Sequence, residues 1–255
     1  MYPHLFTGTP YEIATWNFFF GIGMIVQFIL IFFIIKPKDF RLSRKIYIIA
    51  YLAFITLCPL GGRIASLLLH LPAFIKGEWP STLLSSPNAS LGGLFFGIGI
   101  ALICTKVFLK DKDIGYLRIL DHMIPLAYLQ LAFVRIGCFC NGCCYGTYTD
   151  LPWGCTFFSL SSPRHPTQLY SFIVLVFVLI VTLKIYRKNF PPGTAFFSSL
   201  AMYSFFRFFI ELLRNVSFEI NGIRCSPIFM LGLFIFSLIA LIVNFKNKPR
   251  QKIIS

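Results

Sequence analysis

Long apolar runs separated by short polar segments dominate the hydrophobic pattern of this 255-residue chain. A helix needs about 20 consecutive apolar residues to cross the hydrocarbon core of a bilayer, and most of these runs have that length. We therefore predict an all-α, polytopic membrane protein with seven transmembrane helices, built as a single integral membrane domain over residues 1–255. The predicted spans are 16–35, 46–69, 91–108, 118–134, 168–185, 194–213 and 226–244.

Composition supports this class. Hydrophobic residues make up 57% of the chain and charged residues 13%, which excludes an ordinary soluble domain. The first apolar run is too long, and begins too far from the N-terminus, for a cleaved signal peptide, so we expect it to be a retained span. The second span is interrupted by Pro59, Gly61 and Gly62, and the fourth carries Pro125.

Basic residues predict the orientation. Most of the 23 lysines and arginines lie in alternate loops, with five at 36–45, four at 106–118, three at 184–188 and four at 246–252. Loops that stay in the cytoplasm collect basic residues, so the N-terminus is predicted outside and the C-terminus inside. Contact between these loops and anionic lipids explains the net charge of +14, and we predict no nucleic-acid partner.

The remaining basic residues lie at or near the predicted outer ends of spans, and all but one are arginine. They are Arg63, Lys76, Arg135, Arg164, Arg207, Arg214 and Arg224. A guanidinium group binds phosphate with a planar fork of donors, so this group favours an anionic lipid headgroup as ligand. The alternative, strongest for Arg164 and Arg224, is that the side chains only extend to the membrane interface.

One face of the 194–213 span is polar. Tyr203, Arg207 and Glu211 recur at steps of four, and Arg214 follows three residues later. These positions share one side of a helix. Either Arg207 and Glu211 form an ion pair for helix packing, or Glu211 orients Arg207 toward a polar pocket.

The predicted outer loop, 135–167, contains the most unusual stretch of the chain, RIGCFCNGCCYG at 135–146. Gly137, Gly142 and Gly146 permit turns and close backbone approach, which favours a re-entrant turn that lines a cavity. His165 precedes Pro166 at the start of the next span, where it acts either as an interfacial residue or as a functional group.

The 135–146 stretch resembles the pattern Arg-x-Gly-Asn-Phe-x-Asn-x-Glu-x-x-Gly of the prolipoprotein diacylglyceryl transferases. Other segments resemble that family in the same order, and the likeness covers about residues 15–240. They are GGRIASLLLH at 61–70, LGGLFFG at 91–97, DHMIP at 121–125, RHPTQLY at 164–170 and YSFFRFFIELLR at 203–214.

The resemblance implies an enzyme that moves a diacylglyceryl group from phosphatidylglycerol to the lipobox cysteine of a prolipoprotein, with glycerol 1-phosphate as leaving group. It implies a multi-pass protein of the bacterial cytoplasmic (inner) membrane that needs no cofactor. The residues it assigns to catalysis are Arg135, Tyr203, Arg207 and Glu211. The residues it assigns to substrate binding are Arg63, Gly92, Gly93, Arg135, Gly137, Asn141, Gly142, Gly146 and His165.

Several positions depart from the family pattern. Its histidine before Gly-Gly is Leu91 here, its signature asparagine and glutamate are Cys138 and Cys143, and a later glutamate is Ser171. The tyrosine expected on the first span has no clear match. The usual proton acceptors are thus replaced, and His70, at the end of the span that bears Arg63, is one candidate for a substitute base.

The cysteines leave alternatives open. Cys138, Cys140, Cys143 and Cys144 lie together in the sequence, with Cys155 and Cys225 in other outer segments. Three roles are open for these thiols: structural disulfides, participation in the catalysed reaction, or metal binding. Their spacing matches no standard structural zinc pattern, so we predict no metal. If a thiol is catalytic we favour Cys143, because it replaces a carboxylate and Arg135 would lower its pKa.

Two other functions remain open for the chain. One is a membrane thiol–disulfide oxidoreductase using Cys140 and Cys143, and the other is a catalytically inactive lipid-binding paralogue.

Overall fold

The computed structural model describes residues 4–5, 13–33, 116–158, 160–188, 190–215, 219–220 and 223–246, together with Leu52 and Ile64. The chain divides into two compact units, one of Met1–Ile34 with Leu120–Ser255 and the other of Ile35–Ile119. Nearly all described residues belong to the first unit, which is the subject of the following paragraphs.

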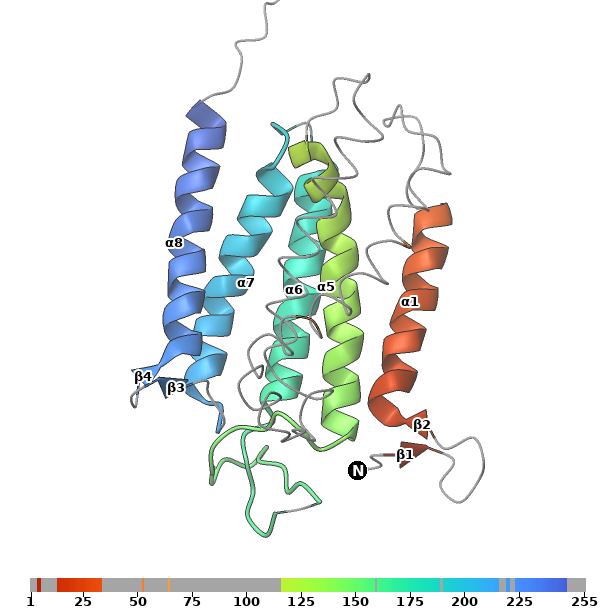
Figure 1. Ribbon diagram of the computed structural model, residues 1–255, viewed down its shortest axis with the longest axis vertical. Helices are drawn as coiled ribbons and strands as arrows, with labels where there is room; N and C mark the ends of the chain where they lie inside the picture. Colours follow the sequence, from red (N-terminus) through yellow and green to blue (C-terminus); the bar gives the residue numbers. More distant parts are fainter. Residues whose placement is uncertain are drawn as a thin grey trace, which may run out of the picture. The chain divides into compact units, whose positions relative to one another are not determined.

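Five helices make up the described part of this unit (Figure 1). They are α1 (Thr15–Phe33), α5 (Tyr116–Cys140), α6 (Thr167–Tyr186), α7 (Thr194–Leu212) and α8 (Cys225–Lys246). Two short antiparallel pairs accompany them, β1 (His4–Leu5) with β2 (Ile13–Ala14), and β3 (Glu219–Ile220) with β4 (Ile223–Arg224).

The helices agree closely with five of the predicted spans. Four are long and apolar enough to cross a membrane, namely Leu120–Cys140, Thr167–Tyr186, Thr194–Leu212 and Cys225–Lys246, and Thr15–Leu30 is a shorter apolar helix. The helical class is therefore confirmed for the described residues. The predicted spans 46–69 and 91–108 lie outside them, so the count of seven and the orientation stay predictions.

The fourth helix is longer than predicted. We expected the span to end at 134 and the loop to begin at 135, but α5 continues to Cys140 and carries Arg135 within it. The helix passes through Gly137, which serves packing against α1 rather than a turn. A Cβ added there would lie 3.2 Å from the Cα of Trp16 and 3.2 Å from the Cβ of Phe19, both in α1.

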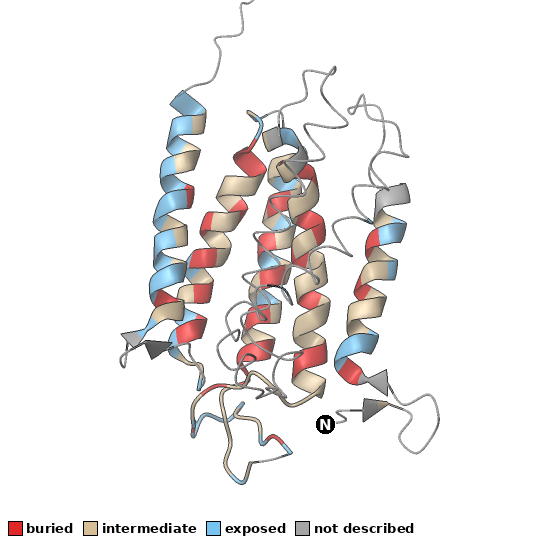
Figure 2. Ribbon diagram, viewed as in Figure 1, coloured by how far each residue is buried: buried red, intermediate tan, exposed pale blue. Residues whose placement is uncertain are grey.

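Packing centres on α6. Its fully buried Leu175 and Val178 form one cluster with Tyr128 and Ala132 of α5, and Tyr203 of α7 packs against that cluster. The buried positions form stripes along α5, α6 and α7 in Figure 2. Helices with such stripes bury their apolar faces against each other, which aligns the three elements that carry the polar residues described below.

Amides join α1 to α5 across the apolar interior. Gln27 donates to Gln130 over 2.7 Å and to the carbonyl of Leu126 over 3.1 Å, and Gln130 donates to the carbonyl of Phe20 over 3.0 Å. Amide hydrogen bonds of this kind hold helices together where the surroundings offer no water.

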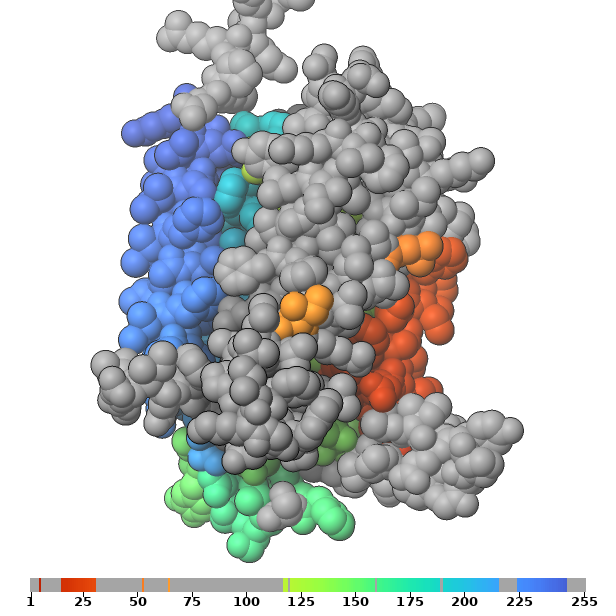
Figure 3. All heavy atoms as spheres, viewed as in Figure 1, coloured from red at the N-terminus to blue at the C-terminus, as the bar shows by residue number. Residues whose placement is uncertain are grey.

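The outer face of α8 is apolar along its length. Figure 3 shows α8 at the edge of the described atoms, and its exposed large side chains include Ile228, Leu231, Ile235, Phe236, Ile239 and Ile242. A continuous apolar face of this size suits contact with lipid tails.

A distant carboxylate caps the start of α7. Asp121 of α5 accepts hydrogen bonds from the backbone N–H groups of Gly193, over 2.6 Å, and Phe196, over 2.7 Å. These N–H groups at the helix start have no partner within the helix itself, so Asp121 satisfies them and joins α5 to α7.

We predict that Asp121→Ala lowers the free energy of unfolding by about 1–3 kcal/mol, because two backbone donors at the start of α7, one of them buried, lose their acceptor. Thermal unfolding of the purified protein in detergent measures this. Asp150→Ala removes an exposed carboxylate and is the matched control, with an expected change within about 0.5 kcal/mol. An Asp121 variant that unfolds at the parent temperature would show that the cap contributes nothing.

Candidate functional site

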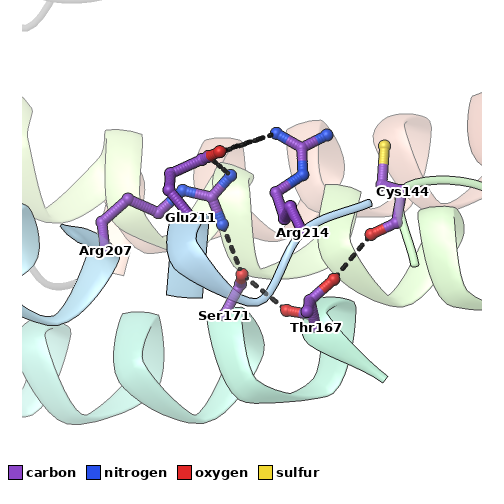
Figure 4. Close-up of polar contacts among 6 residues, drawn as sticks. All are labelled: Cys144, Thr167, Ser171, Arg207, Glu211 and Arg214. Atoms are coloured by element: carbon purple, nitrogen blue, oxygen red, sulfur yellow. Dashed lines mark hydrogen bonds and ion pairs between the residues drawn. The ribbon is translucent and has the colours of Figure 1, made fainter. Parts of the chain in front are cut away.

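A buried carboxylate with two arginines lies at the end of α7. Glu211 and Arg207 are buried and form an ion pair, and Arg214 donates to the two Glu211 oxygens over 3.1 and 3.4 Å (Figure 4). Their spacing of four and three residues puts the side chains on one helix face, as the sequence predicts. We call these three residues the ion cluster.

A chain of hydrogen bonds connects the ion cluster to α6 and to the loop beyond α5. Arg207 donates to the hydroxyl of Ser171 over 2.8 Å, and Ser171 donates to the carbonyl of Thr167 over 2.7 Å. The Thr167 hydroxyl donates to the carbonyl of Cys144 over 2.7 Å (Figure 4). Arg207 is therefore held from two sides, by Glu211 on its own helix and by Ser171 on α6.

Arg135 of α5 adds a third guanidinium group. Its charge interacts with that of Arg207 and with Glu211, so the two arginines that the sequence singles out lie close together. Its Nε atom is buried and has no hydrogen-bond partner among the residues that the structure describes. Arg135, Arg207 and Arg214 face one carboxylate here, which leaves an excess of two positive charges. Such an excess favours an anionic ligand.

The end of α5 forms a Schellman motif, a C-terminal turn closed by two backbone bonds. The N–H of Gly142 donates to the carbonyl of Phe139 over 3.1 Å, and the N–H of Cys143 donates to the carbonyl of Cys138 over 3.1 Å. Gly142 has a φ of 70°, which the motif requires and glycine adopts without strain. This turn brings Cys138 and Cys143 together although five residues separate them.

Three thiols gather at this turn. The sulfur atoms of Cys138, Cys143 and Cys144 all lie within 4.8 Å of one another, and we call them the thiol cluster. Cys138 is buried, whereas the other two are half-buried. The six cysteines among the described residues are free thiols, and Cys140, which we paired with Cys143 in the sequence, is not a member of the cluster.

The expectation of a lowered pKa for Cys143 was wrong. The hydrogen bond with Cys138 lowers this pKa, but the hydrogen bond with Cys144 and burial outweigh it, so the pKa of Cys143 is raised. Cys144 shows the opposite shift. Hydrogen bonds from the thiols of Cys138 and Cys143, and then the charges of Arg214 and Arg135, lower the pKa of Cys144 well below its usual range, although burial opposes the shift. In Figure 4 its sulfur projects on the same side as the Arg214 guanidinium. Its φ of 63° is uncommon for a residue other than glycine, and such backbone conformations concentrate at functional sites.

The loop beyond the thiol cluster docks against the end of α7. Thr147 donates its N–H to the carbonyl of Leu213 over 2.8 Å, and Gly146 donates to the carbonyl of His165 over 2.8 Å. A Cβ added at Gly146 would lie 2.6 Å from the Leu213 carbonyl oxygen, so only glycine allows this approach. Gly146 thus serves docking of the loop.

Two other predicted residues have different neighbours. The His165 ring nitrogen Nδ1 lies 3.2 Å from the hydroxyl of Tyr170, which also accepts a bond from the indole of Trp153. Tyr203 lies half-buried with its ring centre 5.7 Å from that of Tyr128. Tyr203 still interacts electrostatically with Arg135 and Arg207, whereas the His165 ring contacts Tyr170.

The structure thus brings several sequence-predicted residues to one place, with the others elsewhere or undescribed. Grouped at the end of the bundle are Arg135, Tyr203, Arg207, Glu211, Asn141, Gly142 and Cys143. Arg63, His70, Leu91, Gly92 and Gly93 lie outside the described residues.

Sequence reasoning missed the roles of Ser171 and Thr167, and it missed Cys138 and Cys144 as partners of Cys143. For Cys138 and Cys143, the available signal was the spacing Cys-x-x-x-Gly-Cys at the end of a helix.

Comparison with known proteins places these features in context. A family model described as prolipoprotein diacylglyceryl transferase matches residues 3–243. Proteins named phosphatidylglycerol–prolipoprotein diacylglyceryl transferase are similar to this chain, as three examples illustrate. The one from Geobacter sulfurreducens is 34% identical over 56% of this chain and 60% of its own length. The one from Nitrosomonas europaea is 33% identical over 67% and 62%, and the one from Nitratidesulfovibrio vulgaris is 31% identical over 69% and 71%. The chain therefore spans about 60% of the length of the first two relatives.

We predict that Gly146→Ala detaches the loop from α7, because the new methyl group meets backbone that cannot move freely. The expected cost is about 1–3 kcal/mol of unfolding free energy, with faster proteolytic cleavage in residues 147–164. Thermal unfolding and limited proteolysis measure these effects.

Gly232→Ala in α8 is the control, since no atom of the described residues lies within 4 Å of its added Cβ. This variant should gain up to about 1 kcal/mol from helix propensity. Equal cleavage rates in the two variants would contradict the docking role of Gly146.

Proposed function

We propose, starting from the fact that this chain belongs to the prolipoprotein diacylglyceryl transferase family, that it transfers a diacylglyceryl group from phosphatidylglycerol to a cysteine thiol. The acceptor is the lipobox cysteine of a prolipoprotein signal peptide, and the product is a thioether. The protein works in the bacterial cytoplasmic (inner) membrane through seven spans, with its N-terminus outside and its C-terminus inside.

The observation that carries the proposal is the excess of two positive charges formed by Arg135 with the ion cluster. In the reaction, the bond between the glyceryl carbon and the phosphate oxygen breaks, and negative charge builds up on the departing phosphate. Guanidinium groups fixed in advance at that position stabilise the transition state more than the substrate, which accelerates the reaction.

The arginines have different roles in this proposal. Arg207 is held by Glu211 and Ser171, so its planar group is oriented before substrate arrives. Arg135 lacks a described partner for its buried Nε, and a phosphate oxygen would supply one. Arg214 shares Glu211 with Arg207 and thereby lowers the negative charge available to neutralise Arg207. Tyr203 supplies a hydroxyl beside the arginines.

The residues around the α5 turn complete the proposed binding site. Asn141 and Gly142 shape the turn that carries the thiols, and Gly146 fixes the loop beside it. Gly137 lets α1 approach the end of α5 closely, so its contribution is one of position. We propose that Arg63, Gly92, Gly93 and His165 contact the substrates, as the family resemblance implies. We propose a catalytic role for Cys143 as well, and the next subsection gives it a specific form.

The test is reconstitution of the purified chain with phosphatidylglycerol and a lipobox peptide, with the peptide mass as readout. We expect the mass of one diacylglyceryl group to be added. Arg135→Ala should lower the rate by about 10²–10³-fold, the usual cost of one lost charge-stabilising donor. Arg135 is the best position for this test because no described acceptor loses a bond when its Nε is removed.

Arg207→Lys tests whether the planar guanidinium group of Arg207 is required, because lysine keeps the positive charge beside Glu211 and lacks the paired donors. We expect a rate loss of at least about tenfold, and a fall in unfolding free energy of no more than about 1–2 kcal/mol because the ion pair with Glu211 is kept. Arg187→Ala, exposed at the opposite end of α6, is the matched control and should keep the parent rate. Unchanged transfer in Arg135→Ala would sink the proposal, as would a parent protein that binds lipid but adds no mass.

A further inference from the structure

We infer that the thiol cluster of Cys138, Cys143 and Cys144 binds a Zn²⁺ ion whose fourth position receives the thiol of the acceptor cysteine. The inference rests on the proposed function for the role of that fourth ligand, whereas the binding of the ion stands independently of it. It departs from our expectation that the chain binds no metal. That expectation considered only structural sites with four ligands in two separated pairs.

The sulfur positions suit one metal ion. Zinc binds thiolate sulfur at about 2.3 Å, and a tetrahedral arrangement then separates the sulfur atoms by about 3.8 Å. In the structure the three sulfur atoms lie within 4.8 Å of one another without an ion. Closing the cluster around zinc therefore needs movements of about 1 Å or less, which small side-chain rotations supply.

The backbone that carries the ligands is fixed from two directions. The Schellman motif binds the N–H of Cys143 to the carbonyl of Cys138, so two ligands belong to one rigid turn. From α6, Gln168 donates to the carbonyl of Cys143, and Thr167 donates to the carbonyl of Cys144 over 2.7 Å. Ligands held in this way lose little freedom when the ion binds, and such outer contacts support metal affinity.

Charge favours the ion as well. Three thiolates and Zn²⁺ carry one net negative charge, and Arg135 and Arg214 are the cationic groups whose charges act on Cys144. Arg135 also interacts with Cys138. The positive groups that would repel a bare cation therefore attract the complete three-thiolate complex, because its own charge is negative.

Exposure indicates where the fourth ligand enters. Cys138 is buried and closes one side, whereas Cys143 and Cys144 are half-buried and leave the other side accessible. Zinc sites with three protein ligands and one open position are catalytic, while structural sites use four protein ligands. Arg135, the proposed contact of the phospholipid phosphate, interacts by charge with both Cys138 and Cys144.

The ion supplies the step that the replaced family residues leave open. The acceptor thiol binds zinc and releases its proton to water, because a metal ligand must be the thiolate. The thiolate sulfur then attacks the glyceryl carbon, so a carbon–sulfur bond forms as the carbon–oxygen bond to phosphate breaks. The electron pair of that bond leaves with glycerol 1-phosphate, the neutral thioether leaves the metal, and no group is oxidised or reduced.

Metal content of the full chain tests the site directly. The protein is purified in detergent under reducing conditions, incubated with Zn²⁺ and freed of unbound metal, and its zinc is measured by mass spectrometry. We expect one zinc per chain, and a loss of about tenfold or more in Cys138→Ser and in Cys144→Ser. Cys140→Ser and Cys155→Ser are matched controls from the same segment and should keep the full amount.

Cobalt gives a second readout that does not depend on activity. Co²⁺ bound by thiolates absorbs in the near ultraviolet, and this absorption should be absent from Cys144→Ser and present in Cys140→Ser. A lipobox peptide should change the visible cobalt spectrum, and the same peptide with serine in place of its cysteine should not.

The outcomes separate this inference from the proposed function. A reduced protein that binds neither zinc nor cobalt, or a Cys144→Ser variant with the parent zinc content, would overturn the metal site even if transfer proceeds. Binding of one zinc per chain without any transfer activity would support the metal site and contradict the proposed reaction. Transfer that falls at least about tenfold on chelation and returns with added zinc supports both.

Discussion

A single buried carboxylate, that of Glu211, is the constraint on which the charged end of this bundle depends. It accepts bonds from Arg207 and from Arg214, within a helix otherwise rich in phenylalanine and leucine. A charge taken out of water costs several kcal/mol unless a partner compensates for it, so both guanidinium groups must reach this carboxylate. Because Arg207 also donates to Ser171, the same requirement sets the rotation of α7 against α6.

The constraint extends to the loop that follows α5. Thr167 lies one turn before Ser171 and binds the carbonyl of Cys144, and the carbonyl of Leu213, next to Arg214, accepts the N–H of Thr147. The loop is thus attached on both sides of the ion cluster, and this attachment holds the end of α5 with Arg135 nearby. Helix packing and charge pairing place the site together, and neither would do so alone.

Much of this arrangement could be predicted from periodicity. Apolar runs predicted five helices to within a few residues at most boundaries, and steps of four placed Arg207 and Glu211 on one helix face.

Contacts between distant segments could not be predicted, because a single sequence does not reveal which helices meet. The sequence predicts a turn at Gly137, which instead packs against α1, and the hydrogen bond that Gly193 donates to Asp121 spans 72 residues. The prediction of the thiol cluster failed for another reason. The spacing favoured Cys140 as the partner of Cys143, whereas the Schellman motif at the end of α5 brings Cys138 to Cys143.

The substitutions relative to the family pattern then acquire a common physical meaning. Cys143 and Ser171 stand where that pattern has glutamates, so this chain lacks two negative charges beside Arg135 and Arg207, and the described site keeps an excess of two positive charges. Among the three thiols only Cys144 has a lowered pKa, so without a metal the thiol cluster offsets at most one of these charges. Three thiolates around one divalent ion also contribute one negative charge, and the ion keeps all three sulfur atoms deprotonated. The site then keeps one positive charge, which matches the single negative charge of a phosphodiester headgroup. In our proposal, grouping the thiols around a metal therefore replaces part of the negative charge that the glutamates of the family pattern would carry, and it activates the acceptor sulfur at the same end of the bundle as the arginines.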